Sequence, residues 1–452
     1  MQARPRPAVV SALVGLVLVV AAMVVPLLLD EDVRVHFPPL HAWWGPRFDP
    51  LVLVAVAAGV LLWSALPRLC LELPWRVVVV LTTFAGWLWT CALGLSDGRY
   101  GFARVYGRTS EYPHDAQTVR DVPAMLREFV ERIPSSAPDN WHTHVAGHPP
   151  GALLSFVLLD RLGIQDPFWI AMVVVTVGAT SVAAVLLTLD LLGSRDLARR
   201  AAPWLALAPL VVWAGVSADW YFAAVAAWGL YLLARAATSH GPRGWAQGVA
   251  AGLLLGWCVY LSYGLVLLGV LALTVLWLAT RTSRAGARDT STPAPGPTRL
   301  GWWALPWALG GALAVTAVFS AFGFHWWEAY PVLRERYYDG IASERSYGYW
   351  VWANLAAWTC TAGLAVWAAF PATADAVRRR VPLAVLAAGG LTTIALATLS
   401  GMSKAEVERI WLPFTIWVVA VPALLPDRWQ RPLLASQLVV ALLAQTLLVT
   451  RW

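Results

Sequence analysis

Acidic residues and histidines that could support proton transfer lie close together in one stretch of the sequence. Glu111 and Asp115 frame a Glu-Tyr-Pro-His-Asp segment, and a second segment, 141–151, ends in Gly-His-Pro-Pro-Gly. A carboxylate can accept the proton of an attacking hydroxyl group. Two prolines followed by a glycine stiffen the chain and then permit a sharp turn, which would hold His148 in a fixed position. Solvation in an ordinary loop would explain each acid alone, but the acids, histidines and turn together favour a functional site.

A second polar cluster, 403–411, lies between two apolar stretches near the end of the chain. It contains Lys404, Glu408 and Arg409. The two cations could bind a phosphate, with Glu408 orienting Arg409 through a charge-assisted hydrogen bond. The alternative is a solvated turn with local ion pairs of little energetic value. Because the cluster is enclosed by apolar stretches, we favour a functional role.

Two further aspartates stand at the edges of apolar stretches. Asp219 begins one of them, and an ionisable residue at such an edge indicates either a functional site or a helix N-cap. Asp97 directly follows another apolar stretch. It is therefore a third candidate, besides Glu111 and Asp115, for the carboxylate that accepts a proton. Its Ser-Asp-Gly context is typical of a helix-ending turn, which is the interpretation we prefer.

The segment 323–349 is rich in aromatic and basic side chains and includes Glu328 and Arg334. Such a segment could form a platform for a sugar and a clamp for a phosphate. An interfacial aromatic belt is the alternative. His142, His144 and His148 also raise the question of a metal. Three histidines without a fixed carboxylate are insufficient to predict zinc, so no metal site is predicted.

The elements that must position these residues are membrane helices. Of the 452 residues, 59% are hydrophobic and 13% charged, against roughly 45–50% and 25% in soluble domains. This composition excludes a soluble enzyme, a disordered protein and a coiled coil. It predicts an all-α polytopic membrane protein with about thirteen transmembrane helices. The expected spans are 7–29, 50–66, 74–95, 166–193, 202–217, 219–237, 246–263, 264–280, 302–322, 350–370, 382–400, 411–426 and 432–449.

The arginines predict the orientation of these spans. Three Arg-rich loops, after 193, 280 and 377, should be cytoplasmic, which also accounts for the net charge of +7 without a nucleic-acid partner. If the N-terminus is cytoplasmic, all three Arg-rich loops are cytoplasmic only if residues 151–163 do not cross the membrane. That stretch should form a juxtamembrane helix on the outer surface, and 118–133 should form an amphipathic helix there.

This topology divides the chain into four parts. Residues 1–73 form two N-terminal spans, 74–280 a transmembrane core with the outer loop 96–165, and 281–300 a cytoplasmic linker. Residues 301–452 complete the bundle, with outer loops 323–349 and 402–410. The candidate residues therefore share the outer side of a plasma-membrane protein.

The motifs and their order resemble the GT-C superfamily of integral-membrane glycosyltransferases, which includes mannosyl-, arabinosyl- and aminoarabinose transferases. They look most like uncharacterised actinobacterial integral membrane proteins of this type. The matching elements are Glu111-Tyr112, Asp115, the turn 147–151 and the Glu-Arg-Ile-Trp segment 408–411. The resemblance covers roughly residues 74–450, and two spans precede this part of the chain. Many members place the loop after the first span, which leaves the alignment of the first catalytic acid open.

The resemblance implies a polyprenyl-phosphate-linked sugar donor used on the extracytoplasmic face. The acceptor would be a glycan, lipid or protein of the cell envelope, and the membrane lipids would surround the bundle. Glu111 or Asp115 would act as general base, Asp219 would position the acceptor or sugar, and His148 would orient the donor, whose phosphate Lys404 and Arg409 would bind. Some members use a divalent cation, so the use of one stays open here.

Two other classes of function compete with this interpretation. A transporter or flippase needs polar groups in the middle of the membrane, often at broken helices, and an internal repeat. The polar residues here gather at the outer rim instead, which disfavours transport. The other class is a non-catalytic membrane protein of envelope assembly, which no sequence feature excludes.

Overall fold

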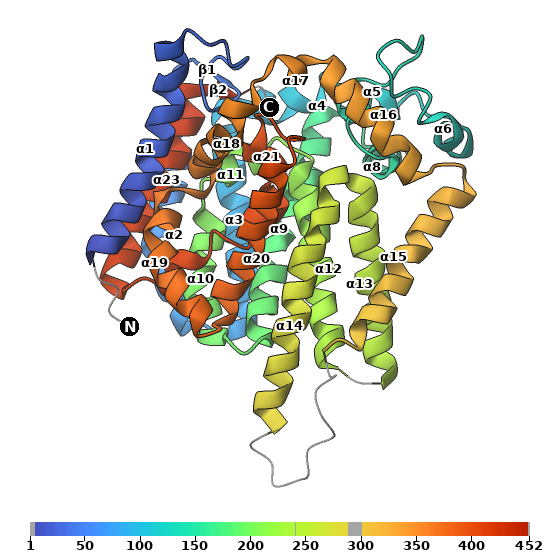
Figure 1. Cartoon of the computed structure of the whole chain (residues 1–452). Helices are drawn as coiled ribbons and strands as arrows, with labels where there is room; N and C mark the ends of the chain where they lie inside the picture. Colours follow the sequence, from blue (N-terminus) through green and yellow to red (C-terminus); the bar gives the residue numbers. More distant parts are fainter. Residues whose placement is uncertain (1–4, 240, 288–300, 451–452) are drawn as a thin grey trace.

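The computed structural model describes residues 5–239, 241–287 and 301–450, and these form a helical bundle (Figure 1). Nine helices in this part of the chain are long and apolar enough to cross a membrane. The prediction of a multi-pass helical membrane protein is thereby confirmed. These spans run through α1 (Pro5–Leu29), α2 (Leu51–Glu72), α3 (Trp75–Gly94), α9 (Pro167–Leu191), α12 (Asp219–Thr238), α13 (Gly241–Leu261), α14 (Leu268–Ala287), α15 (Ala304–Ala321) and α20 (Pro382–Leu399).

Three of the predicted spans are not single straight helices. The segment 350–370 consists of α18 (Tyr347–Ala362) and α19 (Leu364–Arg378), which meet at 101° at Gly363, where φ is +81°. The segment 202–217 breaks after α10 (Arg195–Leu207), because Ala208 is extended before a proline. Short helical turns replace the span expected at 411–426, among them α22 (Leu412–Thr415) and η3 (Val421–Leu424). The last segment, 432–449, lies mostly in α23 (Asp427–Leu447).

A small sheet departs from the all-α expectation. β1 (Ala42–Trp44) pairs antiparallel with β2 (Leu448–Thr450), so that Ala42 lies opposite Thr450. This pairing ties the loop between α1 and α2 to the last residues that the structure describes. The loop therefore lies over one end of the bundle, a position that the sequence does not indicate.

The segment after α3 forms short helices that gather at one end of the bundle. They include α4 (Gly98–Tyr106), α5 (Tyr112–Ala116), α6 (Val122–Glu128), α7 (Thr143–Ala146) and α8 (Pro150–Arg161). At 12 residues, α8 is about 18 Å long and too short to cross a bilayer. α8 packs against α5, and α16 (Trp326–Asp339) lies at the same, upper end of the bundle in Figure 1.

The amphipathic helix expected at 118–133 is shorter than predicted. It begins at Val122, because the side chain of Asp121 caps it by accepting a hydrogen bond from the Ala124 N–H at 3.0 Å. Its apolar residue Leu126, and Phe129 just beyond it, are buried in the protein core. The apolar side of this segment therefore packs on the protein itself.

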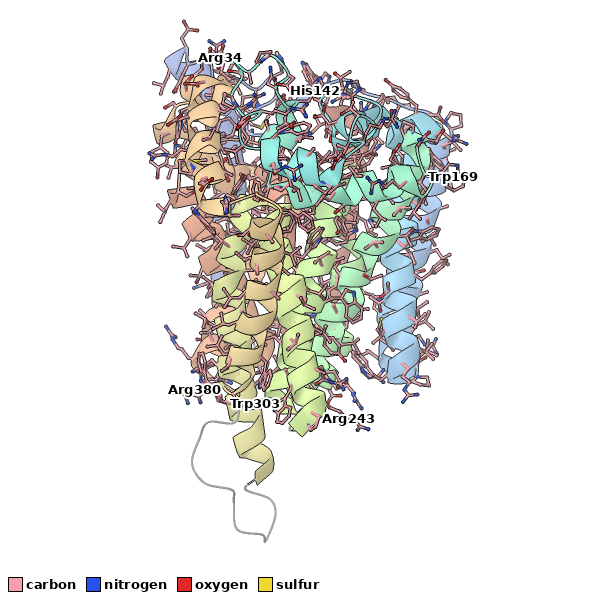
Figure 2. The ribbon with its side chains drawn as sticks, turned by 90° about the vertical axis from the view of Figure 1, so that its right-hand side faces the viewer. Arg34, His142, Trp169, Arg243, Trp303 and Arg380 are labelled. Atoms are coloured by element: carbon pink, nitrogen blue, oxygen red, sulfur yellow. The ribbon has the colours of Figure 1, made fainter. Side chains whose placement is uncertain are left out.

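The two ends of the bundle differ in the residues they carry. Arg243 and Arg380 lie at one end and Arg34 and His142 at the other (Figure 2). The chain near Arg243 and Arg380 thus lies at the end of the bundle opposite the first loop, which contains His142. Most of the predicted linker, residues 288–300, lies outside the described residues.

Helix α13 packs closely against α15, and the Pro-Pro-Gly turn before α8 rests on the end of α13. Gly244, Gly248, Gly252 and Gly256 recur at every fourth position of α13 and allow its backbone to approach α15. A Cβ atom added to Gly252 would lie 1.9 Å from the carbonyl oxygen of Ala308. At the end of α13, a Cβ on Gly151 would lie 2.5 Å from the carbonyl oxygen of Tyr260. Only glycine permits α8 to start this close to α13.

Candidate active site

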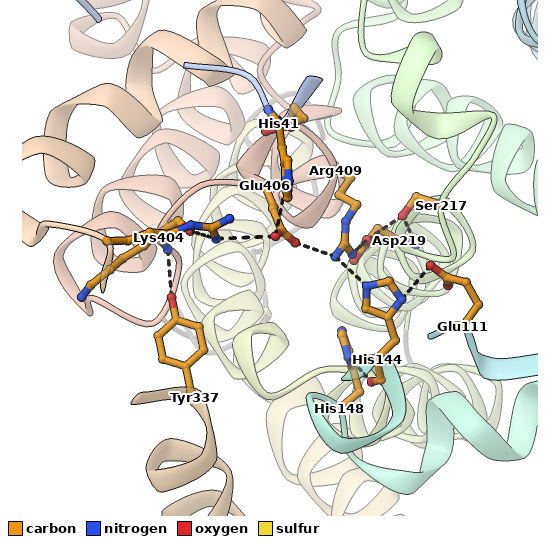
Figure 3. A network of polar contacts seen from close by, with 12 residues as sticks. His41, Glu111, His144, His148, Ser217, Asp219, Tyr337, Lys404, Glu406 and Arg409 are labelled. Atoms are coloured by element: carbon orange, nitrogen blue, oxygen red, sulfur yellow. Dashed lines mark hydrogen bonds and ion pairs between the residues drawn. The ribbon is translucent and has the colours of Figure 1, made fainter. Parts of the chain in front are cut away.

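A buried guanidinium group joins three distant segments of the chain. Arg409 belongs to α21 (Val407–Ile410), and its Nη1 donates to Asp219 Oδ2 at 2.9 Å. Its Nη2 lies 3.0 Å from Glu406 Oε2 and 3.2 Å from His144 Nε2. Figure 3 shows Arg409 between these three partners. Arg409 therefore brings together the first loop, the Asp219 turn and the 402–411 segment.

His144 connects Arg409 to Glu111. Its Nδ1 lies 2.7 Å from Glu111 Oε1, while Nε2 faces Arg409. A guanidinium group can only donate, so Nε2 must be the unprotonated, accepting nitrogen. The proton then resides on Nδ1, the nitrogen that lies close to the Glu111 carboxylate. The geometry thus assigns a neutral imidazole with a fixed tautomer, which orients the Glu111 carboxylate.

Asp219 is the first residue of α12, and its side chain turns toward Arg409 instead of capping the helix. The hydroxyl group of Ser217 donates to Asp219 Oδ2 at 2.6 Å, and the Asp219 N–H donates to Ser217 Oγ at 3.1 Å. Asp219 is 3% exposed and Arg409 7% exposed. The pair is therefore shielded from water, and neither charge could remain buried without the other.

The prediction that Glu408 orients Arg409 is wrong, since Glu406 does so. Residues three apart on a helical turn are neighbours, and Glu406 and Arg409 have this spacing. Glu406 itself has a positive φ of 64°, in a turn that directs its side chain back toward Arg409. The i, i+3 spacing was visible in the sequence and could have identified this pair.

The loop between α1 and α2 supplies an unpredicted contact. His41 Nδ1 lies 3.2 Å from Glu406 Oε1, and the His41 N–H donates to Glu408 Oε1 at 3.3 Å. His41 is buried, so this loop covers the two glutamates from above. No pattern in the sequence connects His41 with residues that follow it by more than 300 positions.

The two neighbouring glutamates have opposite electrostatic environments. Burial favours the neutral acid in both, but the hydrogen bond from His41 and the charges of Arg409 and Arg345 outweigh it and lower the pKa of Glu406. Burial and, to a smaller extent, the charge of Glu406 raise the pKa of Glu408 to about 7. At Arg409, burial opposes the charged form, but Asp219, Glu406 and Glu111 outweigh it and raise its pKa.

Lys404 faces away from Arg409. Its Nζ donates to the carbonyl oxygen of Ala342 at 2.9 Å, and burial and the nearby charge of Arg345 lower its pKa. Arg345, which no sequence motif indicates, donates to the Lys404 carbonyl oxygen at 2.7 Å and lies 3.5 Å from Glu406 Oε1. Glu406 therefore separates two groups of cations, with Arg409 on one side and Arg345 and Lys404 on the other (Figure 3).

Asp115 lies in the same loop as Glu111 but in a different set of contacts. It accepts hydrogen bonds from the backbone N–H and the ring of His142, at 3.1 and 2.7 Å. His148 lies with its Nδ1 2.8 Å from the carbonyl oxygen of His144, and burial lowers its pKa to about 4. His148 is therefore neutral at pH 7 and brings no positive charge to the site. The three histidines each have a different partner and do not converge on one point.

Three residues predicted as further candidates lie apart from the Arg409 cluster. Asp97 pairs with Arg47 and accepts from Gln445, near the small sheet. Glu328 and Arg334 are exposed on α16, where Glu328 lies 3.4 Å from His325. The described contacts thus connect five residues, Glu111, His144, Asp219, Glu406 and Arg409. We call these five residues the buried charge cluster.

Comparison with known proteins adds one structural likeness. No protein-family model and no curated protein sequence matches the chain. Among solved structures, the chain is similar to the oligosaccharyltransferase of Archaeoglobus fulgidus, crystallised with a tethered acceptor peptide that contains an NVT sequon. The TM-score is 0.46 and the sequence identity 10%, over 82% of this chain and 55% of that protein. This chain therefore matches only about half the length of the oligosaccharyltransferase.

Proposed function

We propose that the protein is a glycosyltransferase of the GT-C type, which transfers a sugar from a polyprenyl-phosphate donor to an acceptor of the cell envelope. The observation that carries the proposal is the buried charge cluster. It combines a carboxylate held by a neutral histidine, Glu111, with a second carboxylate held by a guanidinium group, Asp219. The motifs of the first loop and of the 408–411 segment support the same assignment.

Glu111 fits the role of general base best. Its histidine partner is neutral and orients it, so its carboxylate is able to accept the proton of an acceptor hydroxyl group. That hydroxyl oxygen would bond to the anomeric carbon of the sugar while the bond from this carbon to the phosphate oxygen breaks. Asp219, paired with Arg409, would instead hold a hydroxyl group of the acceptor or sugar.

The leaving lipid phosphate requires cations and hydrogen-bond donors. Lys404 and Arg345 lie on the far side of Glu406 from Arg409, and His148 offers a neutral imidazole near Glu111. Because the cluster is buried, donor binding would require a displacement of the segments that cover it, and the His41 loop is one of them.

Transport remains the competing proposal, since broken helices also occur in transporters. The break at Gly363 contacts the uncharged side chain of Gln437, whose amide nitrogen donates to the Ala362 carbonyl oxygen at 2.8 Å. The buried charges lie instead at the end of the bundle with the loops. This placement favours chemistry at a membrane surface over passage through the membrane.

Turnover of labelled donors by the purified protein tests the proposal. The full-length chain in lipid nanodiscs should consume a polyprenyl-phosphate sugar and release polyprenyl phosphate. Glu111→Gln retains the size of the side chain but cannot accept a proton, so kcat should fall roughly 10²- to 10⁴-fold. Asp115→Asn should have a smaller effect, since Asp115 contacts His142 and not the cluster.

Glu131→Gln is the matched control, because Glu131 is an exposed acid of the same loop. Its turnover should equal that of the wild type. Wild-type turnover in the folded Glu111→Gln variant would refute the assigned base. If the protein consumes no member of a panel of polyprenyl-phosphate sugars but moves a sugar or a lipid across vesicle membranes, transport would be favoured instead.

A further inference from the structure

A cavity of about 750 Å³ lies where α2 ends and α10 and α23 begin. This is the end of the bundle opposite the buried charge cluster, at the lower left of Figure 1. Its volume falls within the range of roughly 300–1,000 Å³ typical of ligand sites. Its walls are mostly apolar and include Leu71, Pro203, Trp204 and Leu434, while Gln430 and seven charged side chains line the rest.

The charges around the cavity leave positive charge available. Four arginines and three acids line it. Two of the arginines are neutralised by ion pairs, Arg68 with Glu72 at 2.8 Å and Arg200 with Asp427 at 2.7 Å. The third acid, Asp196, is exposed. The remaining two arginines of the lining are Arg199 and Arg431.

Arg199 and Arg431 contact backbone carbonyl oxygens. Arg199 Nη1 donates to the carbonyl oxygens of Cys70 and Leu73 at 2.7 and 2.8 Å, and Arg431 donates to that of Ser64 at 3.3 Å. Within the described ranges, no carboxylate lies at ion-pair distance from either. A carbonyl oxygen orients a guanidinium group but leaves its charge unneutralised, so both arginines can bind an anion.

The apolar walls indicate which kind of anion the cavity would take. Leu71 lies in the last turn of α2, a helix apolar enough to cross a membrane, and it is 60% exposed. The cavity therefore opens where a membrane span meets the water phase. A free phosphate would leave these apolar walls in contact with water, whereas a lipid would cover them with an acyl chain. Basic pockets between membrane helices are known to bind anionic headgroups.

We propose that this cavity binds an anionic glycerophospholipid. Its phosphate would contact Arg199 and Arg431, and one acyl chain would lie against Leu71 and Leu434. The site is independent of the proposed glycosyl transfer, since it lies at the other end of the bundle and shares no residue with the buried charge cluster.

Binding of defined lipids to the delipidated full-length protein in neutral detergent tests the proposal. The probes are phosphatidylglycerol, phosphatidylcholine with the same acyl chains, and inorganic phosphate, and affinity is read by native mass spectrometry and by the shift in melting temperature. The wild type should prefer phosphatidylglycerol over phosphatidylcholine. Loss of one arginine contact costs about 1 kcal/mol, so Arg431→Gln should weaken phosphatidylglycerol binding about fivefold.

Arg431 is suited to this test because it is exposed and makes a single long hydrogen bond, so its replacement should leave the fold intact. Arg199→Gln should act in the same direction. Arg243→Gln is the control, since Arg243 is an exposed arginine at the same end but outside the cavity (Figure 2). Equal affinity in the Arg431→Gln and Arg243→Gln variants would refute the site. Stabilisation by inorganic phosphate equal to that by phosphatidylglycerol would refute a lipid as its occupant.

Discussion

Arg409 is the residue on which the buried charge cluster depends, since it alone contacts Asp219, Glu406 and His144. Arg409→Met would leave Asp219 buried without its cation, and Glu406 with Arg345 as its remaining cation. Loss of one partner of a buried ion pair typically costs about 3–5 kcal/mol. We therefore expect a large fall in the melting temperature of the detergent-solubilised variant.

Compensation distinguishes this electrostatic effect from simple loss of packing. Asp219→Asn added to Arg409→Met should recover part of the lost stability, because it removes the unpaired charge. Arg334→Met removes an exposed arginine and should leave the melting temperature unchanged. A double variant no more stable than Arg409→Met would contradict the proposed coupling between Asp219 and Arg409.

Glu408 makes stability depend on pH. Its pKa is raised by burial from 4.5 to about 7 in the folded protein. Below pH 4.5 the carboxyl group is neutral in both the folded and the unfolded state, so it does not change the free energy of unfolding. Between pH 4.5 and 7 the unfolded chain releases a proton that the folded chain keeps, so the folded state loses stability as pH rises. Above pH 7 the full penalty, up to about 3 kcal/mol, is present.

Glu408→Gln should remove this dependence. The difference in unfolding free energy between Glu408→Gln and the wild type should grow in favour of the variant from pH 4.5 to about 7 and then level off. Denaturation at several pH values measures this difference. A constant difference across this range would show that Glu408 does not titrate as a buried acid.

At the scale of elements, the contact between α13 and α15 is set by glycine. Gly252→Ala would place a Cβ atom 1.9 Å from the Ala308 carbonyl oxygen, and both atoms belong to helices that cannot shift independently. Overpacking of this kind typically costs about 1–3 kcal/mol. The variant should therefore have a lower melting temperature.

Gly310→Ala is the matched control for this contact. Gly310 lies on α15, and a Cβ atom added there meets nothing within 4 Å. Alanine also stabilises a helix by about 1 kcal/mol relative to glycine, so this variant should equal or exceed the wild type in stability. Equal destabilisation by both substitutions would argue against close approach of the two helices at Gly252.

At the scale of the whole molecule, the arginines at one end predict its orientation in the membrane. From the positive-inside rule we predict that Arg243 and Arg380 face the cytoplasm and that the buried charge cluster, at the opposite end of the bundle, faces the outside. After replacement of the four native cysteines, a cysteine at the exposed position 131 should react with an impermeant reagent added to intact cells. A cysteine at position 243 should react only after the cells are opened. Labelling of position 243 alone in intact cells would invert the orientation.

The sequence by itself determined the class of the protein and most of its helices. Hydrophobic runs long enough to cross a bilayer must become helices there, because the backbone has no other way to satisfy its hydrogen bonds in lipid. Nine of the thirteen predicted spans are accordingly single helices that could cross a membrane.

Tertiary structure decided the helix breaks and the partners within the site. Hydropathy averages over a window and does not register an extended residue such as Ala208 or a bend at Gly363. The sequence identified Glu111, Asp219 and Arg409, because charges beside apolar spans stand out. It assigned the wrong glutamate to Arg409 and missed His41, because contacts between residues hundreds of positions apart depend on how the loops fold over the bundle end.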